Sequence, residues 1–501
     1  MRKAFFSFML RLFNLPKSDI SVKKRGLIII LVDGLGYEVF KRNHTKNKYT
    51  FFSKIFNKDY RLIPYFTGLP ATTTATEAEL FFGESTNIPS FTWFDRKLFK
   101  FVRGNRGPDI ALFEKTIRKR SELLKNGSCI LGVYSAGATL CNLSGEAFNI
   151  KNPFASIKKL QYLFIFLNPY RFLYTCYLVF RSILLSSWML LKKKSKNKFM
   201  TILRDSFSRI FLGNIMTYIA ELEISRETPI LFIDYVLYDE FAHEYGIESK
   251  TSHSSLRLID FYCESLYHAS KKAQRRYEFI ILSDHGQTPS IPIHISTADT
   301  LETMFAAALS DKSRRIIRTY GGFSADSINM KKDIYLVPSG STMHVYFSEK
   351  LQDGYYENEL NTMYPYLTRN LLSQKEIGWI LLKKDSEHQI LIGKYGSVEF
   401  SRGKIKSSKG KPFGKMIPDD QMVQSFAKYA TYGNNGDLVL FGALNHDGRL
   451  YAFEEHKGTH GGFYGEMTKP FIITNNETLI KIASYDTDMK KLFQHIRSLH
   501  Q

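Results

Sequence analysis

The sequence predicts an α/β protein with a doubly wound, mostly parallel sheet. Helical patterns separate short apolar runs, most clearly over residues 254–276. Strands that alternate with helices favour a parallel sheet with helices on both faces, and chemistry in such folds gathers at the carboxyl ends of the strands. The runs that are typical of buried strands, each bounded by Gly, Asp or Pro, are 26–33, 129–134, 229–236, 277–284 and 437–441.

The chain of 501 residues is long enough for one large core with insertions. Its 44% of hydrophobic residues and 23% of charged residues are ordinary for a globular protein. The expected segments are an amphipathic N-terminal helix (1–20), a first part of the core (21–144), an apolar and basic helical insertion (145–215), a second part of the core (216–300), a cap insertion (301–435) and a third part of the core (436–501).

The charge balance favours anionic partners. Lys and Arg number 69 against 48 Asp and Glu, which gives a net charge of +21. Such an excess suits phosphate-rich substrates, anionic membrane surfaces or nucleic acid. The basic residues are dispersed and no nucleic-acid motif is present, so we expect no specific nucleic-acid partner. The four cysteines form no C-x-x-C pair, which argues against a zinc ribbon or a disulfide framework and favours a reducing compartment.

Residues 160–191 are very apolar, and the run KKKSKNK follows them directly. The part 172–191 has the length of a membrane span, yet a single crossing would place the two halves of the core on opposite sides of the bilayer. We therefore expect a helical hairpin over 160–191 that enters one leaflet, with the lysines at anionic headgroups. The N-terminal helix, apolar on one broad face, is expected on the same side. The alternatives are a buried soluble hairpin and a terminal helix packed on its own domain.

Two strand ends carry acidic residues. Asp33 ends the first apolar run, and Gly34 and Gly36 after it allow a tight turn. An Asp after a strand is often only a helix cap, so Asp33 alone is a weak signal. Asp284 and His285 end another strongly apolar run. Two adjacent polar residues at that place are hard to explain by structure alone, which favours a functional site.

A group of threonines precedes an apolar helix. The segment GLPATTTATEAELFFGE contains Thr72, Thr73, Thr74 and Thr76. Thr74 and Glu77 have the spacing of a capping box, which is the structural alternative. A hydroxyl at a helix N-terminus also lies beside free backbone N–H groups that favour a phosphate, and both interpretations can hold together.

Histidines occur in two further segments. Asp239 and His243 are four apart, so one helical turn places both on the same face, a pattern that suits a divalent metal such as zinc. Asp234 and Glu240 are alternatives without that spacing to His243. In EEHKGTHGGFYGE the glycines beside a later histidine indicate close approach of backbone to a ligand. That histidine is His460, and His456 before it is interpreted as an exposed loop residue.

The order Asp, Thr, Asp-x-x-x-His, Asp-His, His resembles the two-metal site of the alkaline phosphatase superfamily, in the pattern of its type I phosphodiesterase/nucleotide pyrophosphatase members. The similarity runs in islands from about residue 26 to residue 474. The segments IPSFTWFDR, YDEFAHEYG and THGGFYGE also look like a bacterial group of membrane-associated members. The resemblance implies the alkaline phosphatase type of α/β fold and two divalent metal ions, with zinc expected and manganese as the alternative.

The resemblance also assigns residues. One metal would be held by Asp239, His243 and His460, and the other by Asp33, Thr73, Asp284 and His285. Thr73 would be the nucleophile, because it stands three residues after Pro70 and ten before Gly83 as in the family pattern. The Phe-Pro that commonly follows that threonine is replaced by Thr74-Ala75, so Thr72 and Thr74 remain open. The family's oxyanion-contacting Asn is not clearly placed, and Asn87 is a weak candidate.

These features predict a metal-dependent phosphodiesterase or phosphatase that acts on a lipid headgroup or a nucleotide-like ester at an anionic membrane surface, on the cytoplasmic face. A metal would lower the pKa of the threonine hydroxyl, and two metals can stabilise the entering and the leaving oxygen. Thr73 is not the Cys or Ser of a sulfatase nor the Ser of a phosphomutase. The alternatives are a headgroup phosphotransferase and a catalytically silent membrane scaffold with the same fold.

Overall fold

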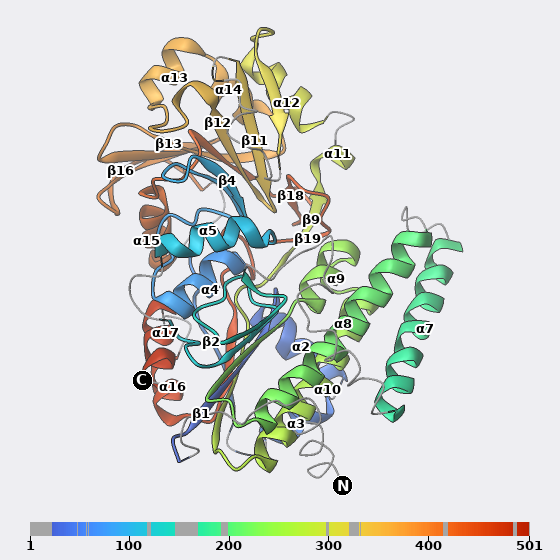
Figure 1. The fold of residues 1–501 in the computed structure, drawn as a ribbon. Helices are drawn as coiled ribbons and strands as arrows, with labels where there is room; N and C mark the ends of the chain where they lie inside the picture. The colour runs from blue at the N-terminus through green and yellow to red at the C-terminus, as the bar shows by residue number, and fades with distance from the viewer. Residues whose placement is uncertain are drawn as a thin grey trace.

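The computed structural model describes residues 23–47, 49–56, 58, 60–117, 122–145, 169–191, 199–296, 300–319, 330, 332–413, 419–483 and 488–499. Two large sheets organise this part of the chain, one in the lower half of the view and one in the upper half (Figure 1). The expected N-terminal helix over 1–20 lies outside the described residues.

The lower sheet is mixed and mostly parallel. Within the described residues it has seven strands in the order β2-β20-β8-β1-β7-β5-β6. The strands from β8 to β6 run parallel, and β20 pairs antiparallel with both β8 and β2. Their bounds are β1 (Gly26–Val32), β2 (Arg61–Pro64), β5 (Ser128–Ile130), β6 (Leu140–Asn142), β7 (Ile230–Tyr235), β8 (Tyr277–Leu282) and β20 (Phe471–Thr474).

Helices cover both faces of this sheet, because alternate residues of its central strand point to opposite sides. Ile28 and Ile30 of β1 belong to one apolar cluster, whereas Leu27 and Ile29 belong to another. The helices on the first side are α2 (Tyr37–Asn47), α3 (Thr50–Phe56), α8 (Phe199–Ser225), α9 (Leu237–Tyr245) and α10 (Lys250–Lys272). Those on the second are α4 (Thr73–Phe82), α5 (Gly107–Ile117), α16 (Glu477–Ile482) and α17 (Met489–Ser498). The expected doubly wound α/β fold is confirmed.

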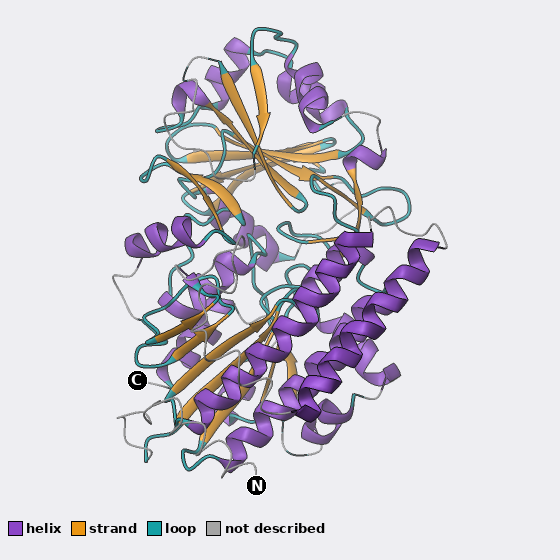
Figure 2. Ribbon diagram, turned by 45° about the vertical axis from the view of Figure 1, so that its right-hand side comes forward, coloured by secondary structure: helices purple, strands orange, loops and turns teal. Residues whose placement is uncertain are grey.

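The apolar insertion contributes helix α7 (Pro169–Leu191), which packs against α8 at the edge of the molecule (Figures 1 and 2). Leu178 and Val179 of α7 lie against Phe211 of α8 and Leu258 of α10. The described part of the expected hairpin over 160–191 is one continuous helix, so α7 pairs with α8, outside that range, and α8 runs unbroken across the expected boundary at residue 215. Residues 160–168 and 192–198 lie outside the described chain. None of the helices in the described ranges combines the length and the apolar character needed to cross a membrane.

The upper sheet has eight strands within the described residues, in the order β10-β11-β12-β17-β13-β14-β15-β16. Helices α12, α13 and α14 cover one face and α15 the other. The bounds are β10 (Arg315–Arg318), β11 (Asp333–Ser339), β12 (Thr342–Phe347), β13 (Ile377–Lys383), β14 (His388–Gly393), β15 (Gly396–Ser401), β16 (Lys404–Gly410), β17 (Leu438–Gly442), α12 (Leu301–Leu309), α13 (Glu357–Met363), α14 (Leu367–Ser373) and α15 (Asp420–Ala430).

The prediction that the run 437–441 joins the parallel core sheet is wrong. It forms β17, which pairs antiparallel with β12 and β13 in the upper sheet. All of its residues are buried, because apolar clusters cover both faces of that sheet. A strand covered on both faces has the same continuous apolar pattern in a parallel core and in the middle of an antiparallel sheet.

Smaller elements join the two sheets. Strand β9 pairs parallel with β18 and antiparallel with β19, and β3 pairs with β4. Arg96, directly after β3, donates hydrogen bonds to the carbonyl oxygens of Gly433 (2.8 Å) and Asn435 (2.9 Å), and it pairs with Asp437 (3.3 Å). The bounds are β3 (Thr92–Asp95), β4 (Lys100–Arg103), β9 (Thr288–Pro292), β18 (Leu450–Ala452), β19 (Gly458–Thr459), α11 (Ile293–Ser296) and the 3₁₀ turn Ser348–Lys350.

Candidate metal centre

Three neighbouring parallel strands end at one edge of the core sheet, and each end supplies acidic side chains. Asp33 follows β1 directly, and Asp284 with His285 follows β8. Asp239 and His243 lie on α9, which follows β7. Because β8, β1 and β7 are adjacent, these side chains meet above the same edge.

Thr73 is the first residue of α4 and faces this group. Its hydroxyl oxygen Oγ1 lies 3.3 Å from His285 Nε2 and 3.5 Å from Asp33 Oδ1. The hydroxyls of Thr72 and Thr74 lie 3.2 Å from each other, and Thr74 donates to the Ser90 carbonyl. Of the three candidate threonines, Thr73 is therefore the one that contacts Asp33 and His285.

The capping-box interpretation of this helix is wrong. The residue that precedes the helix, Thr72, makes no side-chain cap bond. Glu77 instead accepts a hydrogen bond from the backbone N–H of Val133 (2.7 Å), so it is turned away from the first turn of α4. Because the Thr72 side chain does not cap the helix, the backbone N–H groups of the first turn of α4 stay available to an anion.

His460 reaches the group from the loop after β19. Its ring stacks on that of His285 with centroids 3.9 Å apart, and it lies 5.1 Å from the ring of His243. His243 in turn contacts a carboxylate, because its Nε2 lies 3.1 Å from Asp239 Oδ2. The structure thus brings together all seven predicted residues, Asp33, Thr73, Asp239, His243, Asp284, His285 and His460.

Backbone carbonyls orient the three histidines in the same way. The Nδ1 atoms of His243, His460 and His285 lie 2.7 Å, 3.0 Å and 3.1 Å from the carbonyl oxygens of Gly458, Ala71 and Gly286. An Nδ1–H that donates to a carbonyl leaves Nε2 as the free lone pair, which is the arrangement of metal-ligating histidines. Ligand atoms that lie within 4.8 Å of one another form two groups, Asp239 with His285 and His460, and Asp33 with Asp284 and His285.

Burial and mutual repulsion shift the pKa values of these groups. Burial, followed by the charges of Asp284 and Asp239, raises the pKa of Asp33 well above its ordinary value. Burial also raises the pKa of Asp284 to about 6, and it lowers the pKa of His285 to about 4 and that of His460 to about 3. Burial disfavours the charged forms of Asp239 and His243. The attraction between the two side chains outweighs this effect, so it lowers the pKa of Asp239 and raises the pKa of His243 to about 9.

This donor set fits divalent metal ions. Asp284 Oδ2 is buried and has no hydrogen-bond partner among the described residues. Buried carboxylates without a counter-charge are costly, whereas a cation between them removes both the repulsion and the missing contacts. Mixed carboxylate and imidazole ligands at this spacing suit zinc or manganese.

Two nearby residues were missed from the sequence. Gln287 Nε2 donates to Asp239 Oδ1 (2.5 Å) and to the Asp239 carbonyl (3.2 Å), which fixes that carboxylate. The interpretation of His456 as an exposed loop residue is wrong, because its half-buried ring stacks on His243 with centroids 3.8 Å apart. The only signal for His456 was its position four residues before His460, and a loop gives no periodicity from which to infer contact.

The glycines of this region fit close packing of the chain on itself. Gly34 has φ +73°, and a Cβ there would lie 2.2 Å from Asp239 Oδ1. A Cβ on Gly461, at φ +90°, would lie 2.9 Å from the Ser339 carbonyl oxygen. The expected approach of Gly461 to a ligand is thus an approach to the upper sheet. Asn87, the weak oxyanion candidate, uses its Oδ1 to accept from Gly433 N (2.6 Å), which binds the core to α15's following loop.

Comparison with known proteins identifies the family. The model of the type I phosphodiesterase / nucleotide pyrophosphatase family matches residues 27–390. No curated protein sequence matches the chain. Alkaline phosphatase PafA shares 13% identity at a TM-score of 0.54, over 95% of this chain and 96% of its own.

Two further solved structures are more distant in shape. Phosphonoacetate hydrolase from Sinorhizobium meliloti 1021 shares 11% identity at a TM-score of 0.48, over 95% of this chain and 96% of its own. Murine ectonucleotide pyrophosphatase / phosphodiesterase 5 shares 13% identity at a TM-score of 0.47, over 95% of each chain. The likeness to alkaline phosphatase PafA shows a fold of the alkaline phosphatase type. Since the family model covers well over half of the chain, this protein belongs to the type I phosphodiesterase / nucleotide pyrophosphatase family of hydrolases.

Proposed function

We propose that the protein is a metal-dependent hydrolase of phosphate esters in which Thr73 is the nucleophile. The observation that carries the proposal is the position of the Thr73 hydroxyl, 3.3 Å from His285 Nε2 and 3.5 Å from Asp33 Oδ1 at the start of α4. Two divalent ions, zinc or alternatively manganese, would be held by the seven residues of the metal centre. Bound there, they would lower the pKa of the hydroxyl and neutralise charge on the phosphoryl oxygens.

The residues of the chain then have separate tasks. The first turn of α4 directs backbone N–H groups and the positive end of its dipole at the phosphoryl group. Asp33 Oδ1 is an acceptor for the proton of the Thr73 hydroxyl as its oxygen attacks phosphorus. The new Thr73 O–P bond forms while the bond from phosphorus to the leaving alcohol breaks. Water then cleaves the O–P bond, which returns the hydroxyl and releases the phosphate product.

We also propose that the enzyme works at an anionic membrane surface on a lipid headgroup or a nucleotide-like ester. Four apolar side chains of α7 are exposed along one stripe, at the spacing i, i+4, i+7 and i+11. They are Leu173 (65%), Tyr177 (55%), Phe180 (61%) and Leu184 (53%). The lysine-rich sequence 192–198 follows this helix directly. An apolar helix face beside basic residues suits the interface of an anionic bilayer, and flotation with liposomes tests it.

The central experiment combines metal analysis of the purified protein with a screen of phosphate mono- and diesters. We expect close to two equivalents of zinc or manganese and release of product from at least one ester class. Trapping with added alcohols shows whether water or an alcohol takes the phosphoryl group. A protein that binds neither metal, or that binds metal and turns over no ester, would contradict the proposal.

A further inference from the structure

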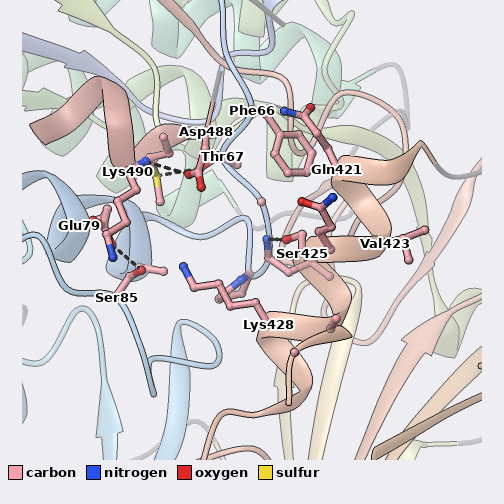
Figure 3. A pocket seen from close by; sticks show the side chains of 18 of the residues that line it. Phe66, Thr67, Glu79, Ser85, Gln421, Val423, Ser425, Lys428, Asp488 and Lys490 are labelled. Carbon is pink, nitrogen blue, oxygen red and sulfur yellow. Dashed lines mark hydrogen bonds between the residues drawn. The ribbon is translucent and has the colours of Figure 1, made fainter. Parts of the chain in front are cut away.

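A cavity of about 700 Å³ lies apart from the metal centre (Figure 3). None of the seven residues of that centre is among the described residues that line it. One wall is the core segment Phe66–Pro70 with Ala75 and Glu79 of α4, and another is α15 of the upper sheet. The start of α17 closes a third side. The cavity therefore lies where three parts of the chain meet, and its volume is that of a small-molecule site.

Three lysines line this cavity, and two of them converge, while the third is Lys404 of β16. Lys428 comes from α15 and Lys490 from α17, and in Figure 3 both side chains point toward the end formed by Glu79 and Ser85. Within the described chain, neither lysine ammonium makes an ion pair at 4.0 Å or less. Two converging ammonium groups from separate elements can hold one carboxylate, sulfonate or phosphate group.

Acidic groups line the same cavity. Glu79 is only 2% exposed, and its Oε2 accepts a hydrogen bond from Ser85 (2.9 Å). Its other oxygen, Oε1, has no hydrogen-bond partner in the described residues. Asp488, exposed at the start of α17, accepts from the backbone N–H of Lys490 (2.9 Å). Asp420 of α15 lines the cavity as well, so its acidic groups come from three different parts of the chain.

The rest of the lining is partly apolar and partly polar. Phe66, Ala75, Val423 and Met489 line the cavity beside uncharged polar side chains such as that of Ser425. A purely anionic ligand would face Asp420 and Asp488 unpaired, and a purely cationic one would face the three lysines. A molecule with both charges, separated by a short apolar spacer, satisfies both sets.

We propose that this cavity binds a small zwitterion, with its anionic group between Lys428 and Lys490 and its ammonium group directed to Asp488. Such an occupant would contact the core and the upper sheet at once. The segment Phe66–Pro70 continues into Ala71, whose carbonyl accepts from His460 Nδ1, and then into Thr73. The site is separate from the phosphoryl-transfer chemistry and does not depend on it.

The test is direct binding to the full-length protein by calorimetry, without any phosphate ester. The probes are 2-aminoethanesulfonate, 4-aminobutanoate and 6-aminohexanoate, which differ in the distance between the charges. The matched controls carry one charge only, namely ethanesulfonate, butanoate and butylamine. We expect at least one zwitterion to bind with one-to-one stoichiometry and to raise the melting temperature, and each single-charge control to bind about tenfold more weakly or not at all.

Variants locate the site. Lys428→Gln and Lys490→Gln should each weaken binding about tenfold, while Lys125→Gln, at an exposed lysine away from the cavity, should not. Val423→Trp should block the space, and Thr73→Ala should bind the probe normally. Equal binding of an anionic control, undiminished binding in both lysine variants, or no binding of any zwitterion would each overturn the proposal.

Discussion

At the scale of single residues, backbone carbonyls decide which nitrogen of each site histidine is free. The carbonyls of Ala71, Gly286 and Gly458 take the Nδ1 side of His460, His285 and His243. The Nε2 side is left for the carboxylates and for a metal. The sequence predicted the histidines themselves, because His285 stands at a strand end, His243 four residues after Asp239, and His460 among glycines. It could not predict the carbonyls, since any residue type supplies one.

The first prediction concerns the nucleophile. Thr73→Ala should abolish turnover, with a loss of at least about a thousandfold, because no other threonine of the group contacts Asp33 and His285. Metal content should remain close to that of the unaltered protein, since six other ligands stay in place. Activity assays and metal analysis of the same preparations provide the check.

Two controls accompany this change. Thr73→Ser keeps a hydroxyl and should retain part of the activity, whereas Thr72→Ala should leave turnover within a few fold. Turnover that survives Thr73→Ala would move the nucleophile to Thr72 or Thr74, or point to direct attack by water.

The second prediction is that metal affinity falls as the pH drops from 7 to 5. Burial raises the pKa of Asp284 to about 6 in the metal-free protein, so this carboxyl is mostly ionised at pH 7 and mostly protonated at pH 5. A metal must displace that proton, which weakens binding about tenfold over this range for one such group. The raised pKa of Asp33 adds in the same direction. Competition with a chelator at the two pH values measures the change, and a pH-independent affinity would contradict it.

At the scale of elements, the apolar runs of the sequence predicted where strands form, but they predicted less well which sheet each strand joins. Runs 26–33, 229–236 and 277–284 became β1, β7 and β8 in the core, whereas 437–441 became β17 in the upper sheet. Apolar continuity reports burial on both faces and carries no information on direction. The apolar segment 160–191 was expected to form a hairpin by itself, whereas its described part is the single helix α7, which pairs with α8 beyond the lysine-rich sequence.

The third prediction belongs to α7. Phe180→Glu with Leu184→Glu should reduce flotation with anionic liposomes severalfold, because the exposed stripe would carry two negative charges toward anionic headgroups. Both side chains are exposed, so the fold should not change. The matched control is Tyr366→Glu with Tyr395→Glu, at cap residues 65% and 71% exposed. Equal flotation of the two double variants would return α7 to an ordinary surface helix.

At the scale of the whole molecule, the candidate metal centre takes its side chains from distant parts of the chain. Thr73 begins α4, Asp239 lies on α9, and His460 comes from a loop that contacts the upper sheet, where its carbonyl accepts from Ser341 (3.0 Å). The convergence of Asp33, Asp239 and Asp284 followed from strand order in a parallel sheet. The attachment of the upper sheet could not be predicted from the sequence. It depends on contacts such as that of Arg96 with the carbonyls of Gly433 and Asn435, and such contacts leave no periodic pattern in the sequence.

The last prediction joins this architecture to stability. Without metal, the buried carboxylates repel one another, and Asp284 Oδ2 has no hydrogen-bond partner among the described residues, so these groups oppose folding. A metal that binds only the folded protein stabilises it by about 2.7 kcal/mol at a hundredfold excess over its Kd. Zinc or manganese should therefore raise the melting temperature, and a chelator should lower it again.

The variant Asp284→Asn should have the higher melting temperature in chelator, and the unaltered protein should have the higher melting temperature in zinc. The amide can keep the contacts that Asp284 Oδ1 makes with the N–H groups of Gly34 (3.1 Å) and His285 (2.9 Å), and it removes a buried charge. In chelator, its melting temperature should equal or exceed that of the unaltered protein, because repulsion with Asp33 is gone. In saturating zinc it should be lower, because one ligand is lost. Scanning calorimetry of both proteins with and without metal measures this crossing. If Asp284→Asn were less stable in chelator and unchanged in its response to zinc, Asp284 would be a structural residue and not a ligand.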